Sequence, residues 1–138
     1  GGAAGVAGAA GSGILRDLIE FLEGNVDGFS SGYDDDDGLG ELLRGGSLEE
    51  VAAEMDDTDL LVGQLETKLE GVERELVDVK AEINEAMRYS ERFTLEERLA
   101  ELEARKDVVS GYVKKSRKRL VKLQGRYKEL IVQGRRDG

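Results

Sequence analysis

Apolar residues recur at alternating steps of three and four along the sequence from Leu48 to Leu130. This spacing is typical of a coiled-coil seam, the face along which one helix packs against another. The seam positions of the first arm are Leu48, Val51, Met55, Thr58, Val62, Leu65, Leu69, Val72, Leu76, Val79, Ile83, Ala86 and Ser90. Those of the second arm are Leu95, Leu99, Leu102, Lys106, Val109, Val113, Ser116, Leu120, Leu123, Tyr127 and Leu130. The pattern predicts an all-α fold built from two long helices.

Two capping boxes indicate where these helices begin. A capping box has Ser or Thr just before a helix and Glu three residues later, and the sequence has one at Ser47–Glu50 and another at Thr94–Glu97. A helix start in the middle of the seam implies that the chain turns there, and helices joined by a short turn pack antiparallel. We therefore expect a long antiparallel coiled-coil helical hairpin over residues 47–138, with arms at about 47–91 and 94–133.

The register of the hairpin follows from this turn. With a turn at Glu91–Thr94, Val72 faces Val113 and Ile83 faces Leu102. The competing interpretation is one continuous helix that dimerises through the same seam. Residues 47–93 hold 14 acidic and 5 basic residues, whereas residues 94–138 hold 7 acidic and 13 basic ones. Folding back brings these opposite charges together and a parallel dimer does not, so the charge pattern favours the hairpin.

The N-terminal third predicts a different organisation. Residues 1–13 are Gly- and Ala-rich and are expected to be flexible, because they offer little side chain to offset backbone entropy. Residues 14–23 form a short amphipathic helix in this interpretation, too short to be stable alone in water, so it must anchor the chain to something. Residues 24–46 form an acidic Gly-rich linker in which Leu39, Leu42 and Leu43 make one further helical turn. The apolar face of the anchor consists of Ile14, Leu15, Leu18, Phe21 and Leu22.

The composition excludes several classes of chemistry. The chain has no His and no Cys, which excludes His-dependent catalytic triads, Cys nucleophiles, zinc fingers and disulfide frameworks. Carboxylates are plentiful, but the pattern implies no pocket that would shift the pKa of one for acid–base work. We expect no enzymatic activity, no catalytic residues and no cofactor.

The run Asp34–Asp37 followed by Gly38 superficially resembles a calcium-binding loop. An EF-hand loop with this glycine at its sixth position requires an oxygen ligand at the first position and Glu at the twelfth. Tyr33 and Arg44 occupy those positions. We therefore interpret the run as solvated linker and predict no metal site.

A basic stretch is the sharpest local feature of the second arm. Between Gly111 and Arg136 there are ten basic residues and one acidic residue, Glu129. Such a helical stripe can bind an acidic protein surface, a nucleic-acid backbone or anionic lipid, or it can simply balance the acidic first arm. The outward heptad positions that we take as candidate partner-binding residues are Lys114, Lys115, Lys118, Lys122 and Lys128.

These features predict a non-catalytic scaffold or assembly subunit. In this hypothesis the hairpin and the anchor helix bridge protein components of a larger complex. The alternative is a nucleic-acid- or ribosome-associated module that binds through the basic second arm. No apolar run approaches the length of a membrane-spanning helix, so we expect a soluble intracellular protein. The processed form of an organelle-imported precursor is a second interpretation, and the sequence does not decide whether the chain forms homo-oligomers.

Overall fold

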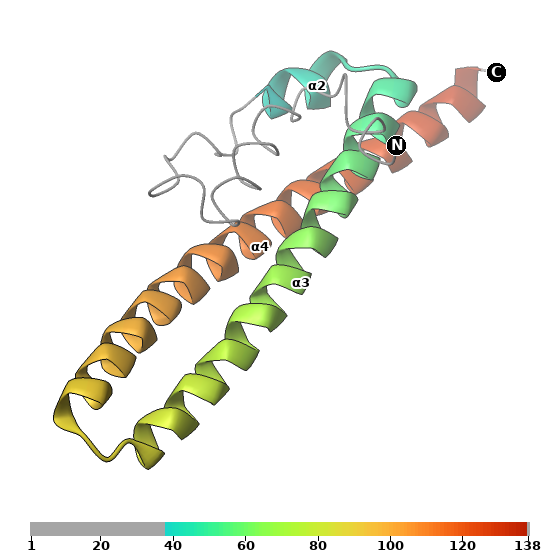
Figure 1. Ribbon diagram of the computed structural model, residues 1–138. Helices are drawn as coiled ribbons and strands as arrows, with labels where there is room; N and C mark the ends of the chain where they lie inside the picture. The colour runs from blue at the N-terminus through green and yellow to red at the C-terminus, as the bar shows by residue number, and fades with distance from the viewer. Residues whose placement is uncertain (1–37, 138) are drawn as a thin grey trace, which may run out of the picture. The chain divides into compact units, whose positions relative to one another are not determined.

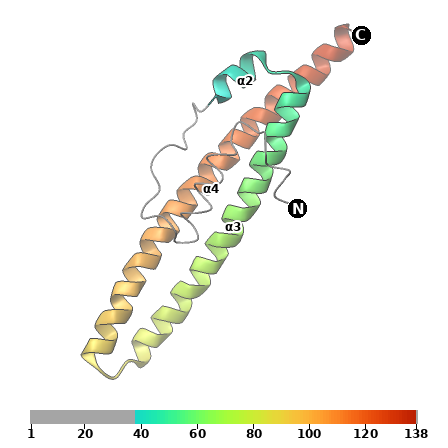
Figure 2. The same ribbon diagram turned by 45° about the horizontal axis from the view of Figure 1, so that its top comes forward.

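The computed structural model describes residues 38–137 and contains three helices within them, with no strand in that range: α2 (Leu39–Gly45), α3 (Leu48–Glu85) and α4 (Tyr89–Asp137). α3 and α4 pack side by side and antiparallel (Figures 1 and 2), which confirms the predicted all-α helical hairpin. The two helices run through two compact units. The end unit comprises the described residues 38–62 and 115–137, and the turn unit is Gly63–Lys114.

The capping box at Ser47 is confirmed. The Ser47 hydroxyl accepts a hydrogen bond from the Glu50 backbone N–H at 3.1 Å. In return the Glu50 carboxylate accepts one from the Ser47 backbone N–H at 2.8 Å. Together they satisfy two N–H groups that have no partner within the helix, and they start α3 at Leu48.

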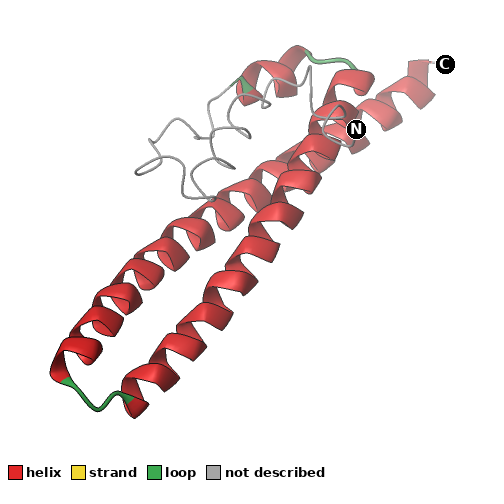
Figure 3. Ribbon diagram, viewed as in Figure 1, coloured by secondary structure: helices red, strands yellow, loops and turns green. Residues whose placement is uncertain are grey.

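The turn lies earlier than the sequence predicts. α3 ends at Glu85 and α4 begins at Tyr89, so residues 86–88 form the connection (Figure 3) and the predicted turn at Glu91–Thr94 is wrong. The last turn of α3 is tightened by a hydrogen bond from the Ala86 N–H to the Ile83 carbonyl at 3.3 Å. Thr94 lies inside α4, where its hydroxyl donates to the Ser90 carbonyl at 3.2 Å and does not cap a helix.

The earlier turn changes the register in the turn unit. Leu102 belongs to a buried cluster with Val72, Leu76 and Val79. The residues predicted to face one another, Val72 with Val113 and Ile83 with Leu102, are therefore not the facing pairs. Partly buried Ile83, Leu95 and Leu99 pack against the same cluster. Seam residues recur every three or four positions along each helix. A shift of one helix along the other by a whole heptad therefore still places apolar residues opposite one another. The position of the turn decides which of these registers forms.

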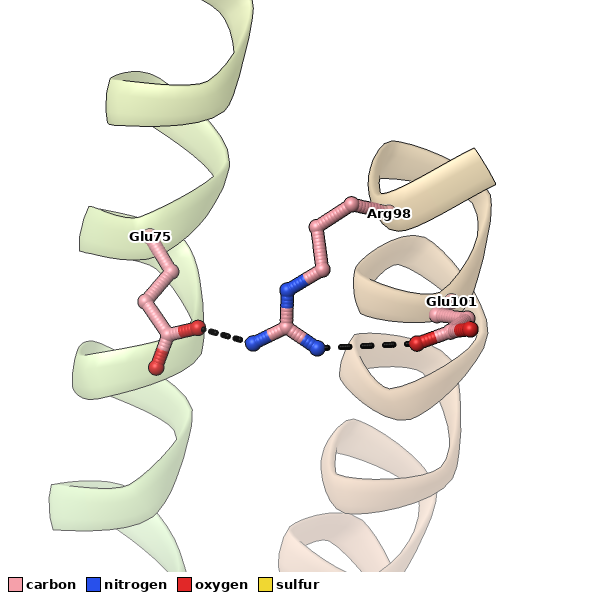
Figure 4. Close-up of polar contacts among 3 residues, drawn as sticks. All are labelled: Glu75, Arg98 and Glu101. Atoms are coloured by element: carbon pink, nitrogen blue, oxygen red, sulfur yellow. Dashed lines mark hydrogen bonds and ion pairs between the residues drawn. The ribbon is translucent and has the colours of Figure 1, made fainter. Parts of the chain in front are cut away.

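Cross-helix ion pairs agree with this register. The Arg98 guanidinium lies 2.8 Å from the Glu75 carboxylate on α3 and 3.5 Å from Glu101 one turn further along α4 (Figure 4). The ammonium nitrogen of Lys106, a seam position, lies 3.7 Å from the Glu73 carboxylate on α3. All of these side chains are about half exposed or more. Because solvent screens these charges, each pair contributes only about 0–1 kcal/mol to the stability of the fold. The pairs are consistent with the observed register but are too weak to determine it.

Burial confirms which residues form the seam. All of the predicted seam positions are buried or half-buried except Ser90, which is exposed beside the turn. Val51, Leu65, Val109 and Leu123 are among the most completely buried side chains. The apolar spacing thus identifies the inner faces of both helices.

In the end unit a third helix covers the hairpin. Leu39 of α2 is 2% exposed and forms a buried cluster with Val51 and Leu123. Packed against this cluster are Leu42, Leu43, Met55, Tyr127 and Leu130. Residues 39–45 are therefore a docked helix, which confirms the predicted helical turn at Leu39, Leu42 and Leu43. The predicted linker, residues 24–46, is wrong over this range, because these residues are helical and pack on the hairpin. Gly38 precedes α2 at φ 75°, a left-handed conformation that favours glycine. The expectations for residues 1–13, for the helix at 14–23 and for the first part of the linker lie outside the described residues.

A crosslinking experiment tests the register. Cys residues placed at Val72 and Leu102 are expected to be joined within one molecule by a short bismaleimide, because both positions lie in one buried cluster. Cys residues at Val72 and Val113 are expected to react poorly, because Val113 lies eleven residues beyond Leu102, about 16 Å along the helix at about 1.5 Å per residue. Gel mobility under denaturing conditions measures the linking of each pair. Efficient linking of Val72 with Val113 and not of Val72 with Leu102 would contradict the register of the structure and support the register predicted from the sequence.

Candidate functional site: the exposed basic face of α4

The last part of α4 turns one face inward and leaves the opposite face to solvent. Ser116 and Leu123 are completely buried in the end unit, and Tyr127 and Leu130 are half-buried there. Residues 118, 121, 125, 128 and 132 follow one another at steps of three and four and are all exposed, so they line the outer face. We call this row, together with the exposed Lys122 beside it, the basic face of α4.

The predicted lysines are exposed. Lys115, Lys118, Lys122 and Lys128 are exposed in the end unit, and Lys114 is exposed as the last residue of the turn unit. Among the described residues, no hydrogen bond or ion pair engages Lys114, Lys118, Lys122 or Lys128. The lysines of the basic face are therefore not used to balance carboxylates of the described part of α3.

Two arginines of the basic stretch, in contrast, pair with carboxylates. Arg119 is buried and pairs with Glu54 of α3, the guanidinium nitrogen lying 3.1 Å from the carboxylate oxygen. Arg126 is partly buried and lies 3.2 Å from Glu129 on its own helix. Neither residue belongs to the basic face, and the one acidic residue of the stretch is taken up by Arg126. A net positive surface with few local counter-charges remains, and it attracts anionic groups.

Exposed aliphatic side chains lie among the lysines, and the sequence analysis missed them. Val121 is 64% exposed and Val132 is 47% exposed. Both lie on the same outward row as Lys118 and Lys128. No apolar periodicity marks them in the sequence, because Val121 and Val132 are eleven residues apart and Gly125 and Lys128 lie between them on this row.

The acidic side chains of the described residues were compared with the requirements of a metal site. The described residues contain no group of three or more His, Cys, Asp or Glu side chains able to hold a metal ion. One carboxyl group is perturbed: partial burial raises the pKa of Asp57 above its usual value of 3.8, and the nearby Glu54 and Asp56 carboxylates raise it further. Asp57 lies on α3 in the end unit, so ionisation of this carboxyl group is expected to change the stability of that unit.

The perturbed carboxyl predicts a pH-dependent stability. The folded-state pKa of Asp57 exceeds its unfolded-state pKa, so the group stabilises the fold at low pH and this contribution is lost as pH rises through the raised value. Asp57→Asn is therefore expected to raise the melting temperature at neutral pH and to leave it unchanged well below pH 3.8. Thermal melts at the two pH values measure this, with exposed Asp59→Asn as the control. An equal gain at both pH values would show that ionisation of Asp57 is not the cause.

The predicted anchor residues Ile14, Leu15, Leu18, Phe21 and Leu22 lie outside the described residues. No helix in the described part of the chain has the length and apolarity to cross a membrane. Comparisons with protein-family models, with curated proteins and with solved structures found no match to this chain.

Proposed function

We propose that this chain is a non-catalytic assembly protein whose basic face on α4 docks an acidic protein partner in a larger complex. The observation that carries the proposal is the combination of exposed lysines without ion pairs and exposed valines on one helical face. The lysines would attract an acidic partner at long range and fix its position along the helix. The valines would add favourable free energy, because contact with the partner removes their apolar surface from water. The predicted anchor at residues 14–23 would provide the second contact that bridging requires.

The exposed lysines also favour a second candidate, a nucleic-acid-binding module. A phosphate backbone would use the same positive charge. Binding to single strands additionally relies on aromatic side chains as stacking platforms. The aromatic residue nearest this surface in sequence, Tyr127, packs against the buried cluster of the end unit. Phosphate contacts would leave Val121 and Val132 without a role, so the protein partner is favoured.

Binding measurements with three probes separate the candidates. The probes are an amphipathic helical peptide of Glu and Leu, a poly-glutamate peptide of equal charge, and a short duplex RNA. We expect the amphipathic peptide to bind most tightly. Val121→Ser is expected to weaken that peptide alone, and Lys122→Glu to weaken all three, because charge attracts every probe but apolar area only one.

Matched controls lie on α3. Val77 is 67% exposed, close to the value for Val121, and Lys80 is an exposed lysine outside the basic face. Val77→Ser and Lys80→Glu are expected to leave all three affinities unchanged. Tight RNA binding with a steep salt dependence that ignores Val121→Ser would instead support the nucleic-acid module.

A further inference from the structure

The start of α4 exposes large apolar side chains beside the turn. Met87 is 93% exposed, Tyr89 is 91% exposed and Phe93 is 64% exposed. Tyr89 and Phe93 are four residues apart in α4, so they lie on one face as neighbours. Met, Tyr and Phe are enriched at the centres of protein interfaces, and large side chains left this exposed indicate a contact surface.

The same helical face continues with small residues. Ala100 lies seven residues, or about two helical turns, after Phe93, Ala104 lies four residues further along, and both are exposed. Small side chains admit a bulky side chain from another helix, so this one face carries both the projecting groups and the sites that can receive them. A surface that contains its own complement fits a second copy of the same chain related by a two-fold axis.

The charges beside this face are arranged in the same self-complementary way. Arg92 and Glu96 are exposed on one flank, four residues apart, and neither side chain has a hydrogen bond or ion pair among the described residues. Arg before Glu at this spacing is the weaker order for a pair within one helix. When two such helices pack antiparallel, however, residues on the same flank face each other, and Arg92 then meets Glu96 of the second copy.

We propose that α4 of this chain packs antiparallel against α4 of a second copy, with the two Phe93 side chains next to the two-fold axis. In this register Tyr89 lies opposite Ala100 of the second copy, and Arg92 lies opposite its Glu96. Two copies of each interaction form at once, because the interface is isologous.

The size of the surface indicates a weak dimer. Each buried aromatic side chain removes about 150–250 Å² from water, and a standard stable interface buries about 1,200–2,000 Å² in total. The four aromatic side chains of the two copies account for about 600–1,000 Å², which is less than that range. The association is therefore expected to depend on protein concentration.

Sedimentation equilibrium of the full chain tests the dimer over a concentration series reaching about 1 mM. The wild type is expected to dimerise, and Phe93→Ser is expected to remain monomeric, with an unchanged melting temperature at monomeric concentration because the side chain is exposed. Val77→Ser removes an equally exposed side chain from α3 and is expected to dimerise normally. A wild-type chain that stays monomeric throughout, or a Phe93→Ser variant that dimerises normally, would overturn the proposal.

Charge reversal tests the geometry. Arg92→Glu alone and Glu96→Arg alone are each expected to weaken dimerisation, and the variant carrying both reversals is expected to recover it. Failure of the double variant to recover would overturn the antiparallel register. A monomeric chain that sediments with anionic phospholipid vesicles in a Phe93-dependent way would overturn the dimer and assign the face to a membrane surface. Lys122→Glu is expected to dimerise normally, so this proposal and the proposed docking function can fail separately.

Discussion

Replacing Arg119 with leucine is expected to lower the free energy of unfolding by about 3–5 kcal/mol, because it leaves a buried carboxylate without its partner. Both side chains of the Arg119–Glu54 pair are 6% exposed, and the charged atoms are 3.1 Å apart. Solvent therefore cannot replace the lost guanidinium. A loss of this size is a large fraction of the stability of a small domain, which is typically about 5–15 kcal/mol.

A double variant distinguishes the cost of leaving one buried charge unpaired from the loss of the ion pair itself. Glu54→Leu combined with Arg119→Leu removes both charges and is expected to recover most of the loss, since an apolar replacement of a buried ion pair is often neutral or stabilising. Urea denaturation followed by circular dichroism measures all three variants, with exposed Lys118→Leu as the control. A loss below about 1 kcal/mol for Arg119→Leu would indicate a solvated pair of the surface kind.

Replacing four helix glycines with alanine is expected to raise the free energy of unfolding by about 3–4 kcal/mol, at about 0.8–1 kcal/mol per site. The sites are Gly63, Gly71, Gly111 and Gly125. Each lies inside α3 or α4, and a Cβ atom built at each would meet nothing within 4 Å. The gain arises because alanine loses less backbone entropy than glycine on entering a helix.

Gly46→Ala is the opposite case and serves as the control. A Cβ atom at Gly46 would lie 2.6 Å from the Leu42 carbonyl oxygen, so this variant is expected to be less stable than the wild type. Thermal and urea unfolding measure both substitutions. No gain from the four-site variant would mean that the glycines at these positions serve a close contact outside the described structure.

The sequence predicts the helices and the seam because burial follows the apolar spacing directly. Val51, Leu65 and Leu123 are buried as expected, and the local hydrogen bonds at Ser47 follow from the capping box. Local chemistry and helical periodicity are both visible in one sequence.

The register could not be predicted for a physical reason. A heptad repeat places apolar residues opposite one another in several registers, so the turn must decide. Residues 86–88 contain no Gly or Pro to mark the turn, while Thr94 and Glu97 match a capping box that the helix does not use. The docking of Leu39 and the pairing of Glu54 with Arg119 depend on that tertiary arrangement, so the sequence pattern alone could not reveal them.

The candidate site was predicted in part. Heptad position identified the outward lysines, including Lys118, but it did not reveal that the neighbouring Arg119 is buried and paired with Glu54. The exposed valines and the aromatic pair beside the turn were missed, because an apolar residue outside the seam has no periodic partner within the chain. Their exposure to solvent, which indicates a contact surface, is visible only in the structure.

Site-specific photo-crosslinking in native cells tests the docking function most directly. A photoreactive phenylalanine derivative at position 121 samples the basic face, and the same group at position 77 samples an equally exposed valine position on α3. We predict a discrete protein adduct from position 121 that is absent from position 77 and is lost when Lys118 and Lys122 are changed to Glu. Adducts with nucleic acid alone, or no adduct from position 121 beyond that from position 77, would contradict a protein-docking role for the basic face of α4.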